Sequence, residues 1–214
     1  MERPDDDSTP ALDDPHGIRV AAAYDRRAGE YIELLGRVDA TSCRDRLAIE
    51  SWADGIDGAI LDAGCGPGQW TRHLAARREE PVVGLDLSAR FLEEARARSP
   101  LLTFVEGDLG QMPFDDGAFD GVLAWFSTIH TPPADMPRVL GELARVTRAG
   151  GRIMLGFFAG TDREPFDHAV TTAYFWQAAS LAHLLEAAGF AVERTVERHE
   201  DGMRPQGEIV AVRV

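Results

Sequence analysis

Cysteine and long apolar runs are both scarce in this sequence of 214 residues. The two cysteines, Cys43 and Cys65, lack the spacing of metal ligands, and so few thiols favour a reducing, cytoplasmic location. Because no apolar run approaches ~20 residues, we expect no membrane-spanning segment. Residues 1–17 are acidic and proline-rich, unlike a secretory signal, and we expect a disordered leader there. We expect residues 18–214 to form a single domain.

Positive charge is also in short supply. The chain carries 22 Lys and Arg residues against 36 Asp and Glu residues, which gives a formal net charge of −14. Such a surface repels phosphate backbones, and no local basic patch compensates, so we expect no nucleic-acid partner. The length suits one α/β domain with an ample core. This balance favours a protein that acts on a small molecule.

Short apolar runs alternate with amphipathic stretches along most of the chain. Several runs, such as AILDA and PVVGLDL, are continuously apolar, which is typical of strands buried on both faces of a parallel sheet. The last two strands follow each other without a helix, and we expect an antiparallel edge from them. The pattern predicts a doubly wound, Rossmann-like α/β sheet of seven strands, mostly parallel with an antiparallel last strand and with helices on both faces. The expected helices cover residues 69–78, 89–98, 134–148, 180–190 and two N-terminal stretches within 18–55, the first interrupted near Gly29.

The stretch LDAGCGPGQW, residues 61–70, places Gly64, Gly66 and Gly68 at alternate positions after an apolar run. Such a turn lets a ligand approach the backbone beside a helix N-terminus. The spacing departs from the G-x-G-x-x-G of dinucleotide sites, and the Lys-Ser or Lys-Thr pair of a P-loop is missing. Asp86 ends the next expected strand, where a carboxylate can accept both hydroxyls of a ribose. The sequence therefore predicts a nucleoside site rather than a dinucleotide site.

Five segments in order carry a family resemblance: DAGCGPG, GLDLS, EGDLGQMPF, FDGVLAWFSTIH and ARVTRAGGRIMLGFF. Together they resemble the ordered motifs of the class I S-adenosylmethionine-dependent methyltransferases. The resemblance covers roughly residues 18–214 and implies S-adenosyl-L-methionine as cofactor, with S-adenosyl-L-homocysteine as product. The implied cofactor-binding residues are Tyr24, Asp62, Gly64, Cys65, Gly66, Asp86, Leu87, Asp108, Leu109 and Trp125.

Within that set the resemblance implies a role for individual residues. The three glycines of the turn face the methionine part of the cofactor, and Asp62 approaches its amino group, often through water. Asp86 holds the ribose hydroxyls. Asp108 accepts a hydrogen bond from the adenine amino group, with Leu87 and Leu109 close to the ring. Judged on the residues alone, the turn could bind nothing, and Asp108 could simply stabilise a turn next to a glycine.

His130 and Tyr24 are the candidate catalytic residues. His130 follows the fourth expected strand, where an acceptor would meet the methyl group, and histidine suits a general base near neutral pH. It could instead order the loop before Pro132 and Pro133 or touch the methionine carboxylate. Tyr24 lies in YDRRAGEY, which is similar to the lid helix of many small-molecule methyltransferases, although it could also pack on the sheet. We assign no metal, because the carboxylate cluster of the catechol-type enzymes cannot be assembled here.

The segment 159–176 joins the fifth expected strand to the last helix and is long enough to form a substrate lid. We expect methyl transfer to a small-molecule acceptor, which is aromatic or apolar if side chains of this region wall its pocket. Two alternatives stay open: a non-catalytic protein that binds S-adenosylmethionine or S-adenosylhomocysteine, and another nucleoside-dependent transferase on the same fold. The aromatic side chains considered for that wall, each with core packing as the alternative, are Trp125, Phe126, Phe158, Phe166, Tyr174, Phe175 and Trp176.

Overall fold

The N-terminal helix lies further toward the start of the chain than the sequence predicts. The computed structural model describes residues 15–35 and 38–214. Helix α1 (Pro15–Leu35) begins three residues before the expected domain start at residue 18, and the rest of the expected leader, residues 1–14, lies outside the described part. The predicted interruption at Gly29 is wrong, because α1 is continuous. A Cβ at this exposed glycine would meet nothing within 4 Å, so the residue lowers helix propensity without breaking the helix.

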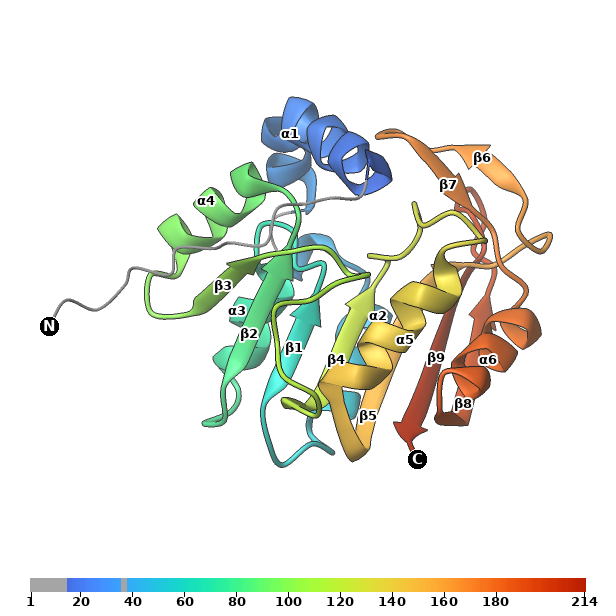
Figure 1. The fold of residues 1–214 in the computed structure, drawn as a ribbon. Helices are drawn as coiled ribbons and strands as arrows, with labels where there is room; N and C mark the ends of the chain where they lie inside the picture. Colours follow the sequence, from blue (N-terminus) through green and yellow to red (C-terminus); the bar gives the residue numbers. More distant parts are fainter. Residues whose placement is uncertain (1–14, 36–37) are drawn as a thin grey trace, which may run out of the picture.

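The remaining elements alternate between helix and strand. In chain order they are η1 (Val38–Ala40), α2 (Cys43–Ala53), β1 (Ile60–Ala63), α3 (Gln69–Ala75), β2 (Val82–Asp86), α4 (Ala89–Arg98), β3 (Thr103–Glu106), β4 (Phe119–Trp125), α5 (Met136–Val146), β5 (Thr147–Phe158), β6 (Pro165–Asp167), β7 (Thr172–Tyr174), α6 (Ala178–Ala187), β8 (Phe190–Arg198) and β9 (Gln206–Arg213). Figure 1 shows them in space.

Within the described residues the main sheet has seven strands in the order β3-β2-β1-β4-β5-β9-β8. The first five strands run parallel to one another, and β9 is antiparallel to both β5 and β8. The predicted doubly wound sheet is therefore confirmed. The last strand, β9, is antiparallel as predicted, and it lies between β5 and the edge strand β8.

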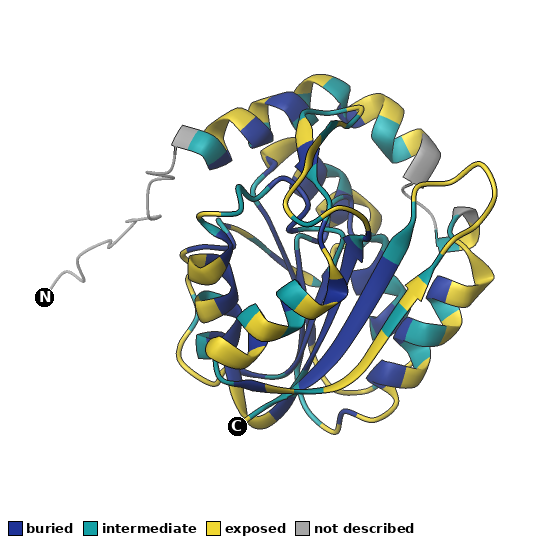
Figure 2. Ribbon diagram, turned by 90° about the vertical axis from the view of Figure 1, so that its right-hand side faces the viewer, coloured by how far each residue is buried: buried dark blue, intermediate teal, exposed yellow. Residues whose placement is uncertain are grey.

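Helices cover both faces of this sheet (Figure 1). On one face α5 and α6 pack on β4, β5 and β9 in the larger core cluster. On the other face α2 and α3 contribute Trp52, Trp70 and Leu74 to a second cluster with Ile60 and Leu123. All four residues of β1 are buried, as expected for a strand covered on both sides. Figure 2 shows the buried residues concentrated in the strands between the helices.

The segment 159–176 contains a small antiparallel hairpin, β6–β7, instead of a structureless link. Its base is tied to the main domain, because Trp176 N donates to Phe158 O at 2.9 Å and Tyr174 N donates to Ile129 O at 3.0 Å. In Figure 1 the hairpin and α1 lie near the edge of the sheet where the parallel strands end. Ligands of doubly wound sheets bind at this edge.

None of the helices described for residues 15–35 and 38–214 combines the length and the apolar character that crossing a bilayer requires.

Candidate active site

A cavity of about 340 Å³ opens at the carboxyl ends of the parallel strands, beneath α1. It takes in most of the side chains that the sequence predicts for the site. Those that line it are Tyr24, Asp62, Gly64, Gly66, Asp86, Leu87, Leu109, Trp125 and His130. Asp108 lines a smaller adjoining cavity of about 50 Å³, which shares Leu87, Leu109 and His130 with the larger one. The predicted residues thus meet in one place, with Cys65 as the exception.

The glycine turn connects β1 to α3 and adopts left-handed backbone at all three glycines, with φ of 81° at Gly64, 55° at Gly66 and 76° at Gly68. L side chains rarely adopt this conformation, so glycine is the favoured residue. Gly64 also faces a neighbour closely, because an added Cβ would lie 2.2 Å from the Ser127 Cβ. A Cβ on Gly66 would meet only the Gln69 Oε1, at 3.9 Å. The turn therefore exposes its backbone to the cavity at Gly64 and Gly66.

Two predicted contacts of this turn point elsewhere. The Cys65 side chain is buried in a cluster with Leu92 and Phe104, and burial raises the pKa of its thiol. Gly68 packs on the same side, where an added Cβ would lie 2.9 Å from the Phe104 ring. Both residues shape the turn from behind and do not line the cavity. Leu85 O fixes the turn by accepting hydrogen bonds from the backbone N–H groups of Gly64 and Cys65, at 2.7 and 2.9 Å.

Asp86 ends β2 with its carboxyl group held by backbone donors. Its Oδ2 accepts from Gly66 N and its Oδ1 accepts from Ser88 N, both at 2.8 Å. The residue is only 8% exposed, and this burial raises its pKa to about 6 despite the backbone donors. Ser88 caps α4, since its Oγ accepts from Phe91 N. Asp86 is thus fixed in orientation where β2 meets the cavity.

Asp62 is a second buried carboxyl group on the cavity wall. Its Oδ2 accepts from the Thr71 hydroxyl at 2.6 Å, and burial raises its pKa to about 7. A buried carboxylate is stabilised by a hydrogen-bond donor or a positive charge. Asp62 and Asp86 together therefore favour a ligand that donates hydrogen bonds and carries positive charge at this end of the cavity.

Two further polar atoms near the glycine turn were not assigned from the sequence. Gln69 Oε1 and Ser127 Oγ are buried, line the cavity, and have no hydrogen-bond partner among the described residues. Buried polar atoms are usually satisfied, so both fit a bound polar ligand. The sequence could have pointed to Gln69, because this residue occupies the position of the last glycine in a dinucleotide-binding motif. The sequence could not have pointed to Ser127, since its approach to Gly64 depends on the pairing of β4 with β1.

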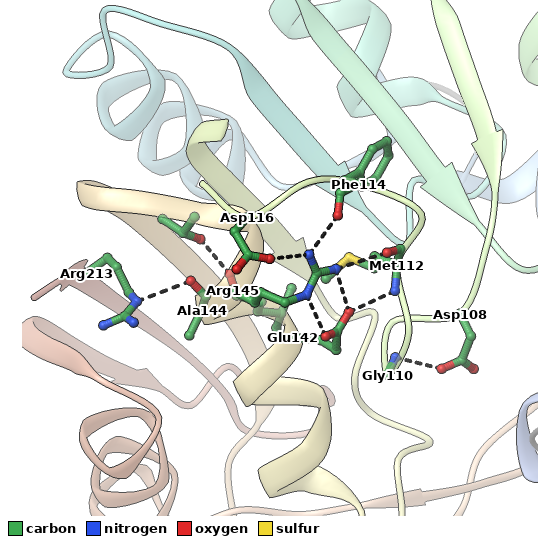
Figure 3. Close-up of polar contacts among 11 residues, drawn as sticks. Asp108, Gly110, Met112, Phe114, Asp116, Glu142, Ala144, Arg145 and Arg213 are labelled. Carbon is green, nitrogen blue, oxygen red and sulfur yellow. Dashed lines mark hydrogen bonds and ion pairs between the residues drawn. The ribbon is translucent and has the colours of Figure 1, made fainter. Parts of the chain in front are cut away.

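Asp108 and Leu109 lie on the loop after β3, and helix α5 holds this loop in place (Figure 3). Arg145 donates to Met112 O and Phe114 O at 3.0 and 2.7 Å and to the carboxylate of Glu142 at 2.8 and 2.9 Å. These hydrogen bonds hold the pKa of Glu142 below its usual value. Asp108 itself accepts from Gly110 N at 2.6 Å.

The two candidate catalytic side chains touch each other. His130 Nδ1 lies 2.8 Å from Thr172 O, and a carbonyl only accepts, so Nδ1 carries the proton. The other nitrogen, Nε2, then accepts from the Tyr24 hydroxyl at 3.0 Å. Burial lowers the pKa of His130 to about 4 and raises that of Tyr24. The histidine is therefore neutral near pH 7, with its lone pair directed at Tyr24 of α1.

Fewer of the aromatic side chains considered from the sequence line the cavity than expected. Trp125, Phe126 and Phe158, at the ends of β4 and β5, line the cavity together with His168 from the hairpin. Phe126 has a φ of 54°, an uncommon conformation for a bulky residue, as found at functional sites. The other four aromatic side chains considered lie away from the cavity, and Trp176 is 1% exposed in the main core. The residues that do not line it are Phe166, Tyr174, Phe175 and Trp176.

Among the described residues, no group of three or more His, Cys, Asp or Glu side chains is placed to hold a metal ion.

The comparisons with known proteins agree with this fold. A family model described as "Methyltransferase domain" matches residues 60–151. A malonyl-[acyl-carrier protein] O-methyltransferase of Erwinia billingiae is 36% identical over 136 residues, which are 63% of this chain and 51% of that protein. The protein of the same name from Pseudescherichia vulneris is 30% identical over 193 residues, 90% of this chain and 71% of that one. The chain spans about half the length of the first relatives it matches.

A solved structure extends the likeness to nearly the whole chain. The geranyl diphosphate C-methyltransferase of Streptomyces coelicolor A3(2) superimposes with a TM-score of 0.73 at 18% identity, covering 96% of this chain and 100% of that one. Such low identity shows the fold alone. With the sequence relatives, it places this chain in a defined class. The chain belongs to the class I S-adenosylmethionine-dependent methyltransferases.

Proposed function

We propose that this protein transfers the methyl group of S-adenosylmethionine to a small-molecule acceptor. One observation carries the proposal. A single cavity is lined at one end by the buried carboxyl groups of Asp62 and Asp86 and, further along, by an aromatic wall with two histidines. When bound, the cofactor supplies an electrophilic methyl group on a sulfonium centre. The chain must then align the acceptor and exclude water.

The chain has groups that fit each part of the cofactor. Asp86, held by two backbone donors, is proposed to accept from the ribose hydroxyls. Asp62, Gln69 and Ser127 offer oxygen atoms for the ammonium group, and the last two have no other partner among the described residues. Leu87, Leu109 and Asp108 would hold the adenine in the smaller adjoining cavity. Cys65 could contribute through its backbone, since its side chain points away.

His130 and Tyr24 are proposed as the pair that accepts the acceptor's proton. His130 Nε2 is unprotonated and already accepts a hydrogen bond from the Tyr24 hydroxyl. An acceptor hydroxyl in place of that bond would give its proton to Nε2 as the methyl group arrives. The low pKa of His130, about 4, keeps Nε2 free of a proton at neutral pH. It also makes the histidine a weak base, which suits an acceptor that is itself acidic.

The residues that line the cavity and the net charge of the chain indicate the chemical class of the acceptor. Trp125, Phe126 and Phe158 favour a flat or apolar molecule. The net charge of −14 disfavours nucleic acid. Helix α1 and the β6–β7 hairpin would act as lids, since both lie over the cavity and Arg27 of α1 donates to Ala169 O. Two free cysteines are in keeping with a cytoplasmic location.

The test is methyl transfer from isotopically labelled S-adenosylmethionine into a small-molecule extract, read by mass spectrometry. We expect labelled products that require the enzyme. Calorimetry with S-adenosylhomocysteine gives the matching binding measurement. Binding without any labelled product, across extracts from several growth conditions, would favour a non-catalytic binding protein. Absence of binding would contradict the cofactor assignment itself.

A further inference from the structure

The end of the cavity furthest from the glycine turn is polar. The order of strands in the sheet gives the order of residues along the cavity. The residues proposed to bind the cofactor follow β1 and β2, the aromatic side chains lie at the ends of β4 and β5, and β9 is the next strand. At this end the cavity is lined by Ser42 and Asp45 from the start of α2, by Met203 from the β8–β9 connection and by Gln206, the first residue of β9. None of these residues contributes to the cofactor assignment.

A buried ion pair stands behind this polar end. Arg198 of β8 pairs with Asp45 Oδ1, and the two side chains are only 8% and 12% exposed. Arg198 also donates through Nε to Gln206 Oε1 at 3.0 Å and through a second nitrogen to the same oxygen. Burying a charged pair costs solvation energy, so such a pair is weak evidence for stability alone. Because Asp45 and Gln206 line the cavity, the position of the pair favours a role in binding.

The contacts of Arg198 leave one hydrogen-bond acceptor, Asp45 Oδ2, and one donor, the Gln206 amide NH2 group, available to a ligand. Because Gln206 Oε1 faces Arg198, its amide NH2 group is turned the other way. Among the residues that the structure describes, Asp45 contacts Arg198 through Oδ1, and no hydrogen bond is found to Asp45 Oδ2 or to that NH2 group. Burial raises the pKa of Asp45 even with Arg198 beside it, while Arg44 and Glu200 act in opposite directions. The carboxylate is therefore short of hydrogen-bond donors.

We propose that Asp45, Gln206 and Arg198 form a subsite for a neutral hydroxyl group of the acceptor, at the end of the molecule away from the methylated atom. A hydroxyl group can donate to Asp45 Oδ2 and accept from the Gln206 amide together. A carboxylate would meet the charge of Asp45, and an ammonium group would be opposed by Arg198. The acceptor is thus a hydroxylated, flat apolar molecule. This inference rests on the proposed function.

Matched pairs of aromatic alcohols test the subsite. Calorimetry with saturating S-adenosylhomocysteine compares hydroquinone with phenol, a naphthalenediol with naphthol, and biphenol with phenylphenol. In at least one pair, we expect the diol to bind wild-type protein about 10-fold more tightly than the mono-alcohol. The amine and carboxylate analogues of the diols should bind no better than the mono-alcohols.

A double variant removes the subsite without leaving a buried charge unpaired. Asp45→Leu with Arg198→Leu should lose the preference for the diol and keep its affinity for S-adenosylhomocysteine. The matched control is Arg194→Leu with Glu208→Leu, which removes an ion pair between β8 and β9, at 2.8 Å, outside the cavity lining. This control should keep the preference.

Three results would overturn the subsite: no pair in which the diol binds better, a preference that survives in the double variant, or tighter binding of the amine or carboxylate analogues. Failure of S-adenosylhomocysteine to bind wild-type protein is a different result. It would remove the proposed function, and the subsite with it, before any alcohol is measured.

Discussion

The two ends of the cavity each hold a buried aspartate, and they hold it differently. Asp86, at the cofactor end, receives backbone N–H groups from Gly66 and Ser88. Asp45, at the far end, pairs with the side chain of Arg198. Backbone donors are set by strand–turn–helix geometry and survive side-chain substitution, whereas a side-chain pair changes with either partner. The cofactor end is therefore rigidly specified, and the acceptor end is open to change without loss of the fold.

The largest effect should come from the backbone-held carboxylate. We expect Asp86→Ala to weaken S-adenosylhomocysteine binding about 100-fold or more, because two hydrogen bonds to a charged group are lost. Calorimetry measures this, with Asp115→Ala, an exposed loop aspartate, as the control. Circular dichroism verifies that the variant is folded. Unchanged affinity would show that Asp86 does not bind the ribose.

The glycine turn permits a comparison between two glycines of similar backbone. Gly64→Ala combines a φ of 81° with a contact of 2.2 Å, and should lower the free energy of unfolding by about 2–3 kcal/mol. Gly66→Ala has a φ of 55° and open space, so about 1 kcal/mol is expected. Urea unfolding measures both. Equal losses would mean that backbone strain alone, and not the approach of Ser127, requires glycine here.

The pH dependence of cofactor affinity should reflect the two carboxyl groups at that end. Their pKa values are about 7 for Asp62 and about 6 for Asp86, and only the ionised forms accept all the ligand's hydrogen bonds. Affinity for S-adenosylhomocysteine should therefore fall as the pH is lowered from 7 to 5, by up to about tenfold per pH unit for each group. In Asp62→Asn the fall should begin at lower pH. A flat profile would contradict a role for either carboxylate.

The same two groups act on stability with the opposite sign. Their folded pKa values lie above the ordinary value of 3.8, so the folded apo protein binds more protons than the unfolded chain between pH 4 and 7. Their contribution to stability is fully present below pH 3.8 and is lost as the pH rises through 6 and 7. A bound cofactor should remove this loss, which thermal unfolding with and without S-adenosylhomocysteine would show.

The smallest effect concerns the lid helix. Gly29→Ala in α1 should raise the free energy of unfolding by about 0.5–1 kcal/mol, because the added Cβ meets nothing. Gly141→Ala in α5 is the matched control, since it is also helical, exposed and open. Stabilisation of both variants is expected. If only Gly29→Ala lowers methyl transfer, the lid helix needs its flexibility for turnover.

The meeting of the predicted residues at the glycine-turn end of the cavity could be predicted from the sequence, because they lie on neighbouring local elements. Gly64, Gly66 and Asp86 lie on two consecutive strand–turn units, and parallel strands end at the same edge of a sheet. Local sequence could not show which way each residue faces. Cys65 and Gly68 belong to the same turn but pack against Phe104.

The acceptor end could not be predicted, because its parts meet only through the tertiary fold. Asp45 stands in the second helix, whereas Arg198 and Gln206 belong to the last two strands. No spacing rule connects such positions. Aromatic residues gave a misleading signal for the same reason: Trp176 follows the hairpin in sequence but is buried in the main core.

The position of β9 has a consequence for the order in which the protein assembles during synthesis. β8 emerges from the ribosome before β9, yet in the sheet its neighbour is β9. Until β9 has been synthesised, the backbone of β5 around Ile153 and Leu155 also lacks its partners Ala211 and Ile209. In the nascent chain, β8 and this side of β5 therefore stay unpaired until β9 inserts between them. This interval is when the chain is most exposed to mispairing and to chaperones.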